Sequence, residues 1–424
     1  MNGRSHVRRI ETVVIGGGQA GLAMSRCLFD RRIDHVVLER GRVAERWRSE
    51  RWDSLRLLTP NWQTRLPEYR YDGPDPDGYM SMPQLIGFFE RYAASFGAPI
   101  ESLTTVLAVE RVGSRFHVRT DRGSWVADNV VIATGYSDLP LVPPLARRLS
   151  PRIRQLVPSE YRNARALSPG AVLVVGASAT GIQLAEEIQA TGRRVTLAVG
   201  RHLRLPRRYR GRDIMSWLDA MGIFDETVDD VFDARISRGQ PSLQLVGRPD
   251  VRSLSLGRLA QDGVRVLGRL IAVEHEEALF DDDLIATTAA SDLKLAELLL
   301  RIDAFVATQS LPDVSPPDPF QPTWPSAVHV TKRAIDLHAD RIDTVVWATG
   351  FRRQYPWLRM PAALDERGEV RQRYGITPVP GLFVLGMHFQ RRRKSAFIDG
   401  VGDDAAFLAG RIARRVPFDV AAVS

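Results

Sequence analysis

The sequence predicts an α/β fold with two Rossmann-like dinucleotide-binding domains, each a three-layer ββα unit. Two stretches carry the same order of short apolar strand, glycine-rich turn and helix: VVIGGGQAGLAMSR at residues 13–26 and VVGASATGIQLAEE at residues 174–187. A second short pattern also occurs twice, because the tripeptide ATG ends the apolar runs 130–135 and 345–350. We therefore interpret the chain as a duplicated unit.

The first turn has the spacing of a diphosphate-binding loop. Residues 11–15 are a β-branched run of the kind found in buried parallel strands. Gly16 permits the tight turn, Gly18 lets the backbone approach a pyrophosphate, and Gly21 lets the following helix pack on the strand. Gln19 and Ala20 complete the turn, and the helix is expected from about residue 22 to 30 with its positive end toward the phosphates. The alternative is a merely tight strand-to-helix turn.

An acidic residue follows the next strand. Residues 35–38 form a second apolar run that ends at Glu39, followed by Arg40. At this spacing a carboxylate accepts hydrogen bonds from a ribose. The first domain is therefore expected to bind FAD or NAD.

The second turn differs from the first at two points. Gly176 and Gly181 correspond to Gly16 and Gly21, but Ser178 stands where the first turn has a glycine; Ala179 and Thr180 complete this turn. The strand that follows ends at Val199 rather than at an acid, and Arg201 and His202 come next. A missing acid with an arginine nearby favours a ribose 2′-phosphate, so the second domain is expected to bind NADPH. The alternative for Arg201 is a solvated loop charge.

The two ATG strand ends are expected to close the crevice beside each cofactor. These residues are Ala133, Thr134 and Gly135 in the first copy and Ala348, Thr349 and Gly350 in the second. The expected domain division is 1–165 together with 326–424 for the FAD domain, and 166–325 for an NADPH domain with a helical insertion. FAD and NADPH in one chain imply hydride transfer between them.

The chain resembles the flavin-containing monooxygenases and their Baeyer–Villiger and YUCCA-type relatives over nearly its whole length. The resemblance rests on GGGQAG, Glu39, residues 45–47 (ERW), GASATG, both ATG strands and residues 381–386 (GLFVLG). It implies that Trp47 contacts FAD, that Val106 lies near the adenine, and that the region 214–325 shapes a substrate channel. Asn61 is the candidate for the active-site asparagine of this family, and the alternative is a turn residue after Pro60.

The resemblance implies a monooxygenase that uses NADPH and O2, forms a C4a-(hydro)peroxyflavin and inserts one oxygen atom into a small organic substrate. The chain departs from the family fingerprint before the second turn, where only Tyr161 matches and Pro151, Ile153 and Val157 replace Phe, Gly and His. Two alternatives therefore stay open. One is an NADPH-dependent flavin reductase or oxidase without oxygen transfer, and the other is a non-catalytic FAD- and NADPH-binding sensor or transport-associated protein.

Composition limits the remaining classes. The chain has 424 residues, a net charge of +8 and a single cysteine, Cys27, which excludes an internal disulfide and a redox-active cysteine pair. Neither a nucleic-acid motif nor a membrane-spanning apolar run is present, so we expect neither partner, and we expect a cytoplasmic protein, monomeric or homodimeric. The arginine run 201–213 is expected to be a solvated face or entry funnel beyond Arg201, and the acidic run 281–283 a solvated loop without a metal.

Overall fold

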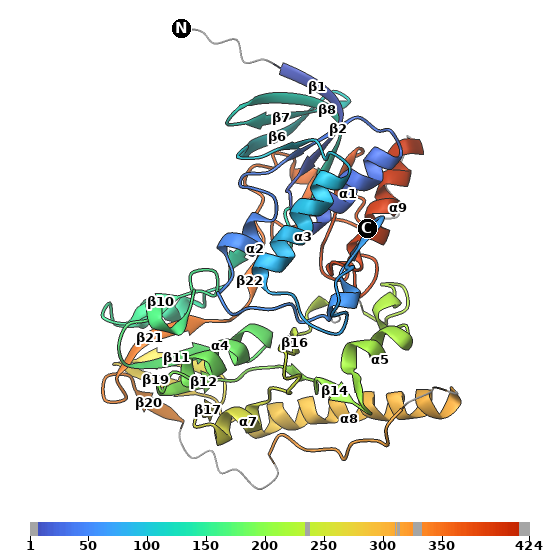
Figure 1. Ribbon diagram of the computed structural model, residues 1–424. Helices are drawn as coiled ribbons and strands as arrows, with labels where there is room; N and C mark the ends of the chain where they lie inside the picture. The colour runs from blue at the N-terminus through green and yellow to red at the C-terminus, as the bar shows by residue number, and fades with distance from the viewer. Residues whose placement is uncertain (1–6, 234–237, 310, 312–313, 325–332, 415–424) are drawn as a thin grey trace.

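The first unit is built on a seven-stranded sheet (Figure 1). The computed structural model describes residues 7–233, 238–309, 311, 314–324 and 333–414. Strands run in the order β5-β2-β1-β8-β7-β6, with β23 also paired to β8. Pairing is parallel among β5 (Ile100–Glu101), β2 (His35–Leu38), β1 (Val7–Ile15), β8 (Gly123–Ile132) and β23 (Leu382–Val384). Strands β6 (Val106–Val112) and β7 (Arg115–Thr120) join β8 as an antiparallel meander.

Helices cover one face of this sheet. In Figure 1, α1 (Gln19–Asp30), α3 (Met82–Ser95) and α9 (Val401–Arg414) lie together on one side of the strands. They bury an apolar core with Val14 and Val131 from the sheet. The opposite face packs on residues from the stretch 355–387, which supply a second apolar cluster.

The second unit repeats this arrangement on a smaller scale. Its five strands are all parallel and run β10 (Arg154–Leu156), β21 (Ile342–Trp347), β11 (Ala171–Val175), β12 (Val195–Ala198), β17 (Arg265–Leu267). Helices α4 (Ala179–Gln189) and α7 (Leu256–Gln261) pack on it. The antiparallel strands β18 (Leu270–Glu274), β19 (Glu277–Phe280) and β20 (Ala334–Asp336) lie beside it, and α8 (Leu284–Thr308) runs along the lower edge of the molecule (Figure 1). The expected α/β class with two Rossmann-like units is confirmed.

Two strands lie on the other side of the expected domain boundaries. Both β10, before residue 165, and β21, after residue 326, belong to the second sheet. The reason is the duplication itself: β21 ends in the second ATG and pairs with β11, as β8 pairs with β1 in the first unit. The parts of the expected ranges at 1–6, 325–332 and 415–424 lie outside the described residues.

The chain crosses between the units at a small antiparallel ribbon, in which β9 (Leu139–Pro140) pairs with β22 (Phe351–Arg352). The remaining short elements are α2 (Glu45–Ser49), β3 (Arg65–Leu66), β4 (Tyr69–Arg70), β13 (Leu203–Arg204), β14 (Arg208–Tyr209), β15 (Arg212–Asp213), α5 (Ile214–Ala220), β16 (Leu243–Gln244) and the 3-10 turns Asn61–Gln63, Pro144–Arg148, Ala164–Ala166, Ile223–Asp225 and Pro361–Ala363.

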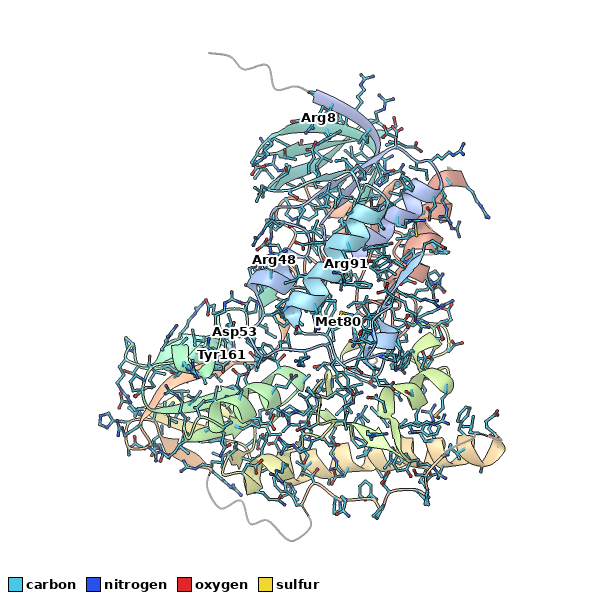
Figure 2. The ribbon with its side chains drawn as sticks, in the orientation of Figure 1. Arg8, Arg48, Asp53, Met80, Arg91 and Tyr161 are labelled. Atoms are coloured by element: carbon cyan, nitrogen blue, oxygen red, sulfur yellow. The ribbon has the colours of Figure 1, made fainter. Side chains whose placement is uncertain are left out.

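A polar seam joins the two units near Asp53 and Tyr161, which are labelled in Figure 2. The Tyr161 hydroxyl donates to Glu187 on α4 at 2.8 Å, and Ser54 donates to the same carboxylate. Asn163 donates to Asp53 at 2.7 Å. Tyr161, the one surviving fingerprint residue, is buried and bonds to α4 within the second unit. The bonds of Ser54 to Glu187 and of Asn163 to Asp53 hold the first unit's loop against the second unit.

Candidate cofactor and substrate site

The first glycine turn is shaped by its own backbone at two positions. Gly16 has a φ of +113°, and a Cβ there would lie 2.5 Å from the carbonyl oxygen of Ala133. A Cβ on Gly21 would lie 1.8 Å from the carbonyl oxygen of Gly16. Gly18 is different, because an added Cβ would meet nothing within 4 Å. Gly16 and Gly21 are thus required for close packing of β1, β8 and α1, and Gly18 faces open space.

The second turn reproduces this geometry. Gly176 has a φ of +105°, and a Cβ would lie 2.4 Å from the carbonyl oxygen of Ala348, while a Cβ on Gly181 would lie 1.8 Å from that of Gly176. Ser178, which corresponds to Gly18, has an ordinary φ of −75°. Because the matching Gly18 position faces open space, a serine fits the second turn without distorting it.

Both turns lead into helices that leave their first N–H groups available. Neither Gly18 at the start of α1 nor Ser178 at the start of α4 makes a side-chain capping bond, and neither helix has an acid in its first turn. Uncapped N–H groups and the positive end of the helix dipole favour phosphate binding. Each turn therefore has the donors that a dinucleotide diphosphate needs.

Glu39 is held in place at the end of β2. Its carboxylate accepts the N–H of Gly17 at 2.5 Å and that of Gly41 at 2.7 Å, and the residue is 9% exposed. Arg40 is exposed and lies 3.6 Å from Glu50. The glutamate is thus oriented beside the turn, in the position expected for a ribose-binding acid.

A cavity of about 1100 Å³ opens from the first turn and extends to the second unit. At one end it is lined by the turn, Glu39, Arg40, Trp47, Val106 and the ATG residues 133–135. At the other end the wall comes from both units and is largely apolar, with Arg204, Glu226, Lys294, Arg301 and Arg393 among its residues. The apolar residues there are Leu57, Leu58, Leu203, Leu205, Met215, Leu218, Ile223, Phe224, Leu243, Leu245, Leu295, Leu298, Phe389, Phe397 and Ile398. Its volume is above the roughly 300–1,000 Å³ of drug-sized pockets. It therefore has room for a dinucleotide and a small substrate together.

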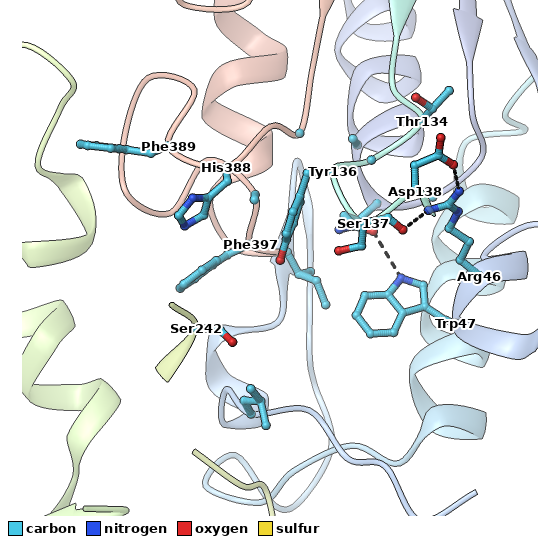
Figure 3. Close-up of a pocket in the computed structure, with 18 of the residues that line it drawn as sticks. Arg46, Trp47, Thr134, Tyr136, Ser137, Asp138, Ser242, His388, Phe389 and Phe397 are labelled. Atoms are coloured by element: carbon cyan, nitrogen blue, oxygen red, sulfur yellow. Dashed lines mark hydrogen bonds and ion pairs between the residues drawn. The ribbon is translucent and has the colours of Figure 1, made fainter. Parts of the chain in front are cut away.

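Aromatic and polar side chains also line the cavity. In Figure 3, His388, Tyr136 and Phe397 gather on one side of the cavity and Trp47 and Arg46 on the other. The rings of Tyr136 and His388 have centroids 6.0 Å apart. Burial lowers the pKa of His388 below its ordinary value, and the positive charges of nearby arginines act in the same direction. His388 is therefore a neutral imidazole at pH 7.

Arg46 orders the loop after the first ATG strand. Its guanidinium donates to the carbonyl of Ser137 and to the carboxylate of Asp138 (Figure 3). Trp47 lies next to it, and its indole Nε1 donates to the Gln19 side chain at 3.3 Å. The motif residues 45–47 therefore tie the loop 135–138 to the first turn.

Two groups of expected cofactor residues lie in different surroundings. Gly16, Gly18, Gln19, Ala20, Glu39, Arg40, Trp47, Val106 and residues 133–135 line the cavity, whereas Gly21 is buried between α1 and β1. The second-unit residues do not line it; these are Gly176, Ser178, Ala179, Thr180, Gly181, Arg201, His202, Ala348, Thr349 and Gly350. The structure thus brings the first group together around one cavity, and the second group forms a separate turn.

Arg201 and His202 differ in their exposure to solvent. Arg201 is exposed and forms no hydrogen bond or ion pair with the part of the chain that the structure describes. His202 is 4% exposed; its Nδ1 lies 3.0 Å from the carbonyl oxygen of Gly200, and its Nε2 has no hydrogen-bonding partner among the described residues. Burial lowers the pKa of His202 below its ordinary value. Of the two, only Arg201 is accessible to a phosphate, so the expectation for His202 does not match its position.

Asn61 also lies away from the cavity. Its Nδ2 donates to the carbonyl of Asp75 and its Oδ1 accepts the N–H of Met80, both at 2.8 Å. The residue is buried and its amide holds the loop 75–80 in place. The alternative of a structural turn residue is therefore the one that fits, and the catalytic role expected for Asn61 does not.

The arginine run is not a solvated face throughout. Arg204 pairs with Asp292 at 2.6 Å, Arg210 pairs with Asp303 at 2.8 Å, and Arg207, which is 1% exposed, pairs with Asp213 at 2.5 Å. The carboxylates that partner Arg204 and Arg210 are on α8, which was too distant in sequence to be recognised as their counterpart. These arginines fix the second unit's inserted segment to α8.

Among the described residues there is no group of three or more metal-binding side chains, and the acidic run pairs with arginines, Asp281 with Arg269 and Asp282 with Arg333. None of the helices in the described ranges has the length and apolar character needed to cross a membrane. Cys27 is buried, which raises the pKa of its thiol to about 12.

Comparison with known proteins relates this geometry to flavoproteins. The model of the pyridine nucleotide-disulphide oxidoreductase family matches residues 13–220. An uncharacterized CzcO-like oxidoreductase of Geobacillus kaustophilus is 31% identical over 406 residues, covering 95% of this chain and 98% of its own. Indole-3-pyruvate monooxygenase YUCCA1 of Oryza sativa subsp. japonica is 27% identical over 395 residues, covering 88% and 86%.

Solved structures agree on the fold. A flavin-containing monooxygenase from Stenotrophomonas maltophilia superposes with a TM-score of 0.64 at 19% identity, covering 96% of this chain and 99% of its own. At this identity the likeness concerns the fold alone.

Proposed function

Because the chain belongs to the family of CzcO-like oxidoreductases, which are flavin-containing monooxygenase-like proteins that use FAD and NAD(P)H, we propose that it is an NADPH- and O2-dependent flavin monooxygenase acting on a small organic substrate. The observation that carries the proposal is the single cavity whose one end is a dinucleotide turn and whose other end is an apolar chamber.

The first turn fits FAD. The open space at Gly18, the uncapped start of α1 and the oriented carboxylate of Glu39 correspond to the pyrophosphate and ribose of one dinucleotide. Trp47 and Val106 would contact the same cofactor from the cavity wall. Bound FAD supplies hydride acceptance from NADPH and activation of O2, chemistry that protein side chains lack.

The second turn fits NADPH. Its glycines pack as those of the first turn do, and the start of α4 is equally uncapped. After β12, Val199 stands where the first unit has an acid, and an acid there would repel a 2′-phosphate. Arg201 is exposed two residues later, so its guanidinium is available to bind that phosphate. Gln244 on β16 donates to the carbonyl of Ala177 at 2.5 Å, which fixes the turn from its outer side.

The chain's own residues then bind the substrate and exclude water. The apolar chamber removes the substrate from bulk solvent, which prevents side reactions of the reduced cofactor. His388 and Tyr136 are among the polar groups that line this cavity, with their rings 6.0 Å apart. The neutral imidazole of His388 can donate or accept one hydrogen bond there without adding charge.

A thiol–disulfide reaction is not compatible with this chain, although its family model includes disulphide oxidoreductases. Such a reaction needs an exposed thiolate, and Cys27 is buried, protonated at pH 7 and alone in the sequence.

The nicotinamide preference tests the second turn. We expect Arg201→Ala to lower the rate of FAD reduction by NADPH at least tenfold, at limiting nucleotide concentration, and to leave the NADH rate within twofold, because a bidentate arginine–phosphate contact contributes about 1.5–3 kcal/mol. Arg147→Ala, an exposed arginine on the 3-10 turn Pro144–Arg148, is the matched control. An unchanged NADPH to NADH ratio in Arg201→Ala would remove the basis for NADPH.

Oxygen transfer is tested by the fate of O2. The FAD-loaded protein is turned over with NADPH under ¹⁸O2 against a panel of amines, sulfides, ketones and 2-oxo acids, and products are analysed by mass spectrometry. A monooxygenase places one ¹⁸O atom in a product and releases less hydrogen peroxide per NADPH when that substrate is present. A second candidate, the reductase or oxidase, is favoured by the loss of the fingerprint at Pro151, Ile153 and Val157. It would release one peroxide per NADPH with every compound.

A further inference from the structure

The outward face of α8 carries apolar residues along its length, with the exposed charges Lys294, Glu297 and Arg301 along one border. The inner face is buried by Leu284, Leu295, Leu299 and Ile302. On the outer face Ile285, Leu293 and Leu300 are 46%, 62% and 68% exposed. Five exposed alanines share this face or border it: Ala286, Ala289, Ala290, Ala304 and Ala307. The solvent side of a surface helix normally carries charged and polar residues, so this face has the composition of a contact surface.

The chain after α8 extends this face along one side. Thr323 donates to Asp292 at 2.8 Å, and the indole of Trp324 donates to Thr288 at 3.0 Å, so this segment runs back beside the helix. It carries Phe320, which is 43% exposed. In Figure 1, α8 and this segment form the lower edge of the molecule, with no other element below the helix on that side.

We propose that a second copy of this chain packs against this face, with the two α8 helices antiparallel. The order of large and small residues is self-complementary about the midpoint between Lys294 and Leu295. In that register Ile285 of one copy faces Ala304 of the other, Leu293 faces Ala296, and Leu300 faces Ala289. Large residues opposite small ones let two helices approach closely and interlock.

Charges at the border of the face agree with the same register. Lys294 and Glu297 lie on one flank, where Lys294 also lines the cavity, and neither forms an ion pair within the described ranges of the chain. In a two-fold antiparallel pair the same flank of both helices meets, so Lys294 of each copy lies beside Glu297 of the other. The two reciprocal pairs would favour a copy of this chain over an unrelated helix.

A lipid surface fits this face less well. Helices that lie on membranes have a polar side rich in lysine and arginine. Here α8 begins directly after Asp281, Asp282 and Asp283, and its opposite side is buried in the second unit rather than free. Acidic residues at one end of the helix would be repelled by anionic headgroups.

The available area sets the expected affinity. A helix of 25 residues is about 37 Å long, so a strip about 10 Å wide offers about 400 Å² per copy and about 800 Å² in the pair. Phe320 adds to this on each copy. Such an interface is at the low end of specific complexes, so we expect a weak and reversible dimer.

Sedimentation velocity of the FAD-loaded full chain from about 1 µM to about 200 µM tests the proposal. The wild type is expected to shift from monomer to dimer across this range. Leu293→Glu is expected to weaken the dimer at least tenfold, because it places two carboxylates at the centre of the contact. Ile271→Glu, which replaces a 50% exposed apolar residue on β18, is the matched control and should dimerise as the wild type does.

A charge exchange tests the register without altering the apolar face. Lys294→Glu alone is expected to weaken the dimer several-fold, and the double change Lys294→Glu with Glu297→Lys should restore it to within threefold. A wild type that is monomeric at about 200 µM overturns the proposal, as does a dimer that Leu293→Glu leaves intact. A protein that stays monomeric but sediments with vesicles of phosphatidylcholine and phosphatidylglycerol also overturns it and assigns the face to lipid.

Discussion

The three glycine positions of the first turn are expected to respond differently to substitution. A Cβ on Gly21 would sit 1.8 Å from the carbonyl oxygen of Gly16, against about 3.4 Å for ordinary contact. Relief requires β1 and α1 to separate by about 1.5 Å, and forcing atoms into a packed interior costs about 1–3 kcal/mol or more. We therefore expect Gly21→Ala to lower the free energy of unfolding by about 3 kcal/mol.

Gly18→Ser should act on the cofactor instead. A side chain at Gly18 meets no protein atom within 4 Å, its φ is −86°, and serine at this helix start is what the second turn has in Ser178. The free energy of unfolding should therefore stay within about 1 kcal/mol of the wild type. The added atoms point into the cavity that we assign to FAD, so the dissociation constant for FAD should rise at least tenfold, about 1.4 kcal/mol.

The assay compares two measurements on each variant. Urea unfolding of FAD-stripped protein, followed by circular dichroism, gives the stability, and flavin fluorescence titration gives the FAD affinity. Ser178→Gly is the matched control, since it alters the corresponding position of the second turn and should leave FAD affinity unchanged. The reasoning fails if Gly18→Ser is destabilised as strongly as Gly21→Ala, or if it binds FAD as tightly as the wild type.

Three further outcomes follow from buried groups. The pKa of His202 is lowered in the folded chain, so the unfolded state gains a proton first as pH falls below about 6.5, and acid favours unfolding. His202→Phe should therefore reduce the loss of unfolding free energy between pH 7.5 and 5.5 by up to about 1.4 kcal/mol in urea titrations. An equal loss in both proteins would contradict this. Arg207→Met removes the partner of Asp213 at a site 1% exposed and should cost about 3 kcal/mol, seen as a lower melting temperature; a melting temperature equal to that of the wild type would show that the pair contributes nothing. Cys27, with its pKa raised to about 12, should react with a thiol reagent at pH 8 only after unfolding, and rapid labelling of native protein would mean that its helix opens readily.

The sequence predicted those features that depend on local spacing. Both glycine turns and the acid after β2 follow from residues close together in the chain, and the structure has them where expected. The membership of β10 and β21 in the second sheet was missed, because strand pairing depends on contacts across the chain rather than on local pattern. The repeated ATG could have placed β21, because the first ATG ends β8, which pairs with β1 in the first unit. The strand that ends in the second ATG would then be expected to pair with β11 in the second unit.

The far wall of the cavity could not be read from the sequence. Leu203, Leu205, Leu245 and Leu298 come from three separate segments of the second unit, and as single residues each looks like an ordinary core position.

The catalytic role predicted for Asn61 does not fit its position for a related reason. An asparagine after a proline is compatible both with a turn and with a site, and only the two backbone partners of its amide show which one it is.

The difference between the two turns is informative because of where it falls. In each copy two glycines are fixed by the protein's own carbonyl oxygens, at 2.4–2.5 Å and 1.8 Å from an added Cβ, so a change there would damage the fold whatever cofactor is bound. The remaining position is Gly18 in the first copy, where an added Cβ meets no protein atom within 4 Å, and Ser178 in the second. It is the position at which the copies differ. A residue free of internal contacts is constrained by its ligand alone. The serine at position 178 therefore fits a change of cofactor with the fold retained.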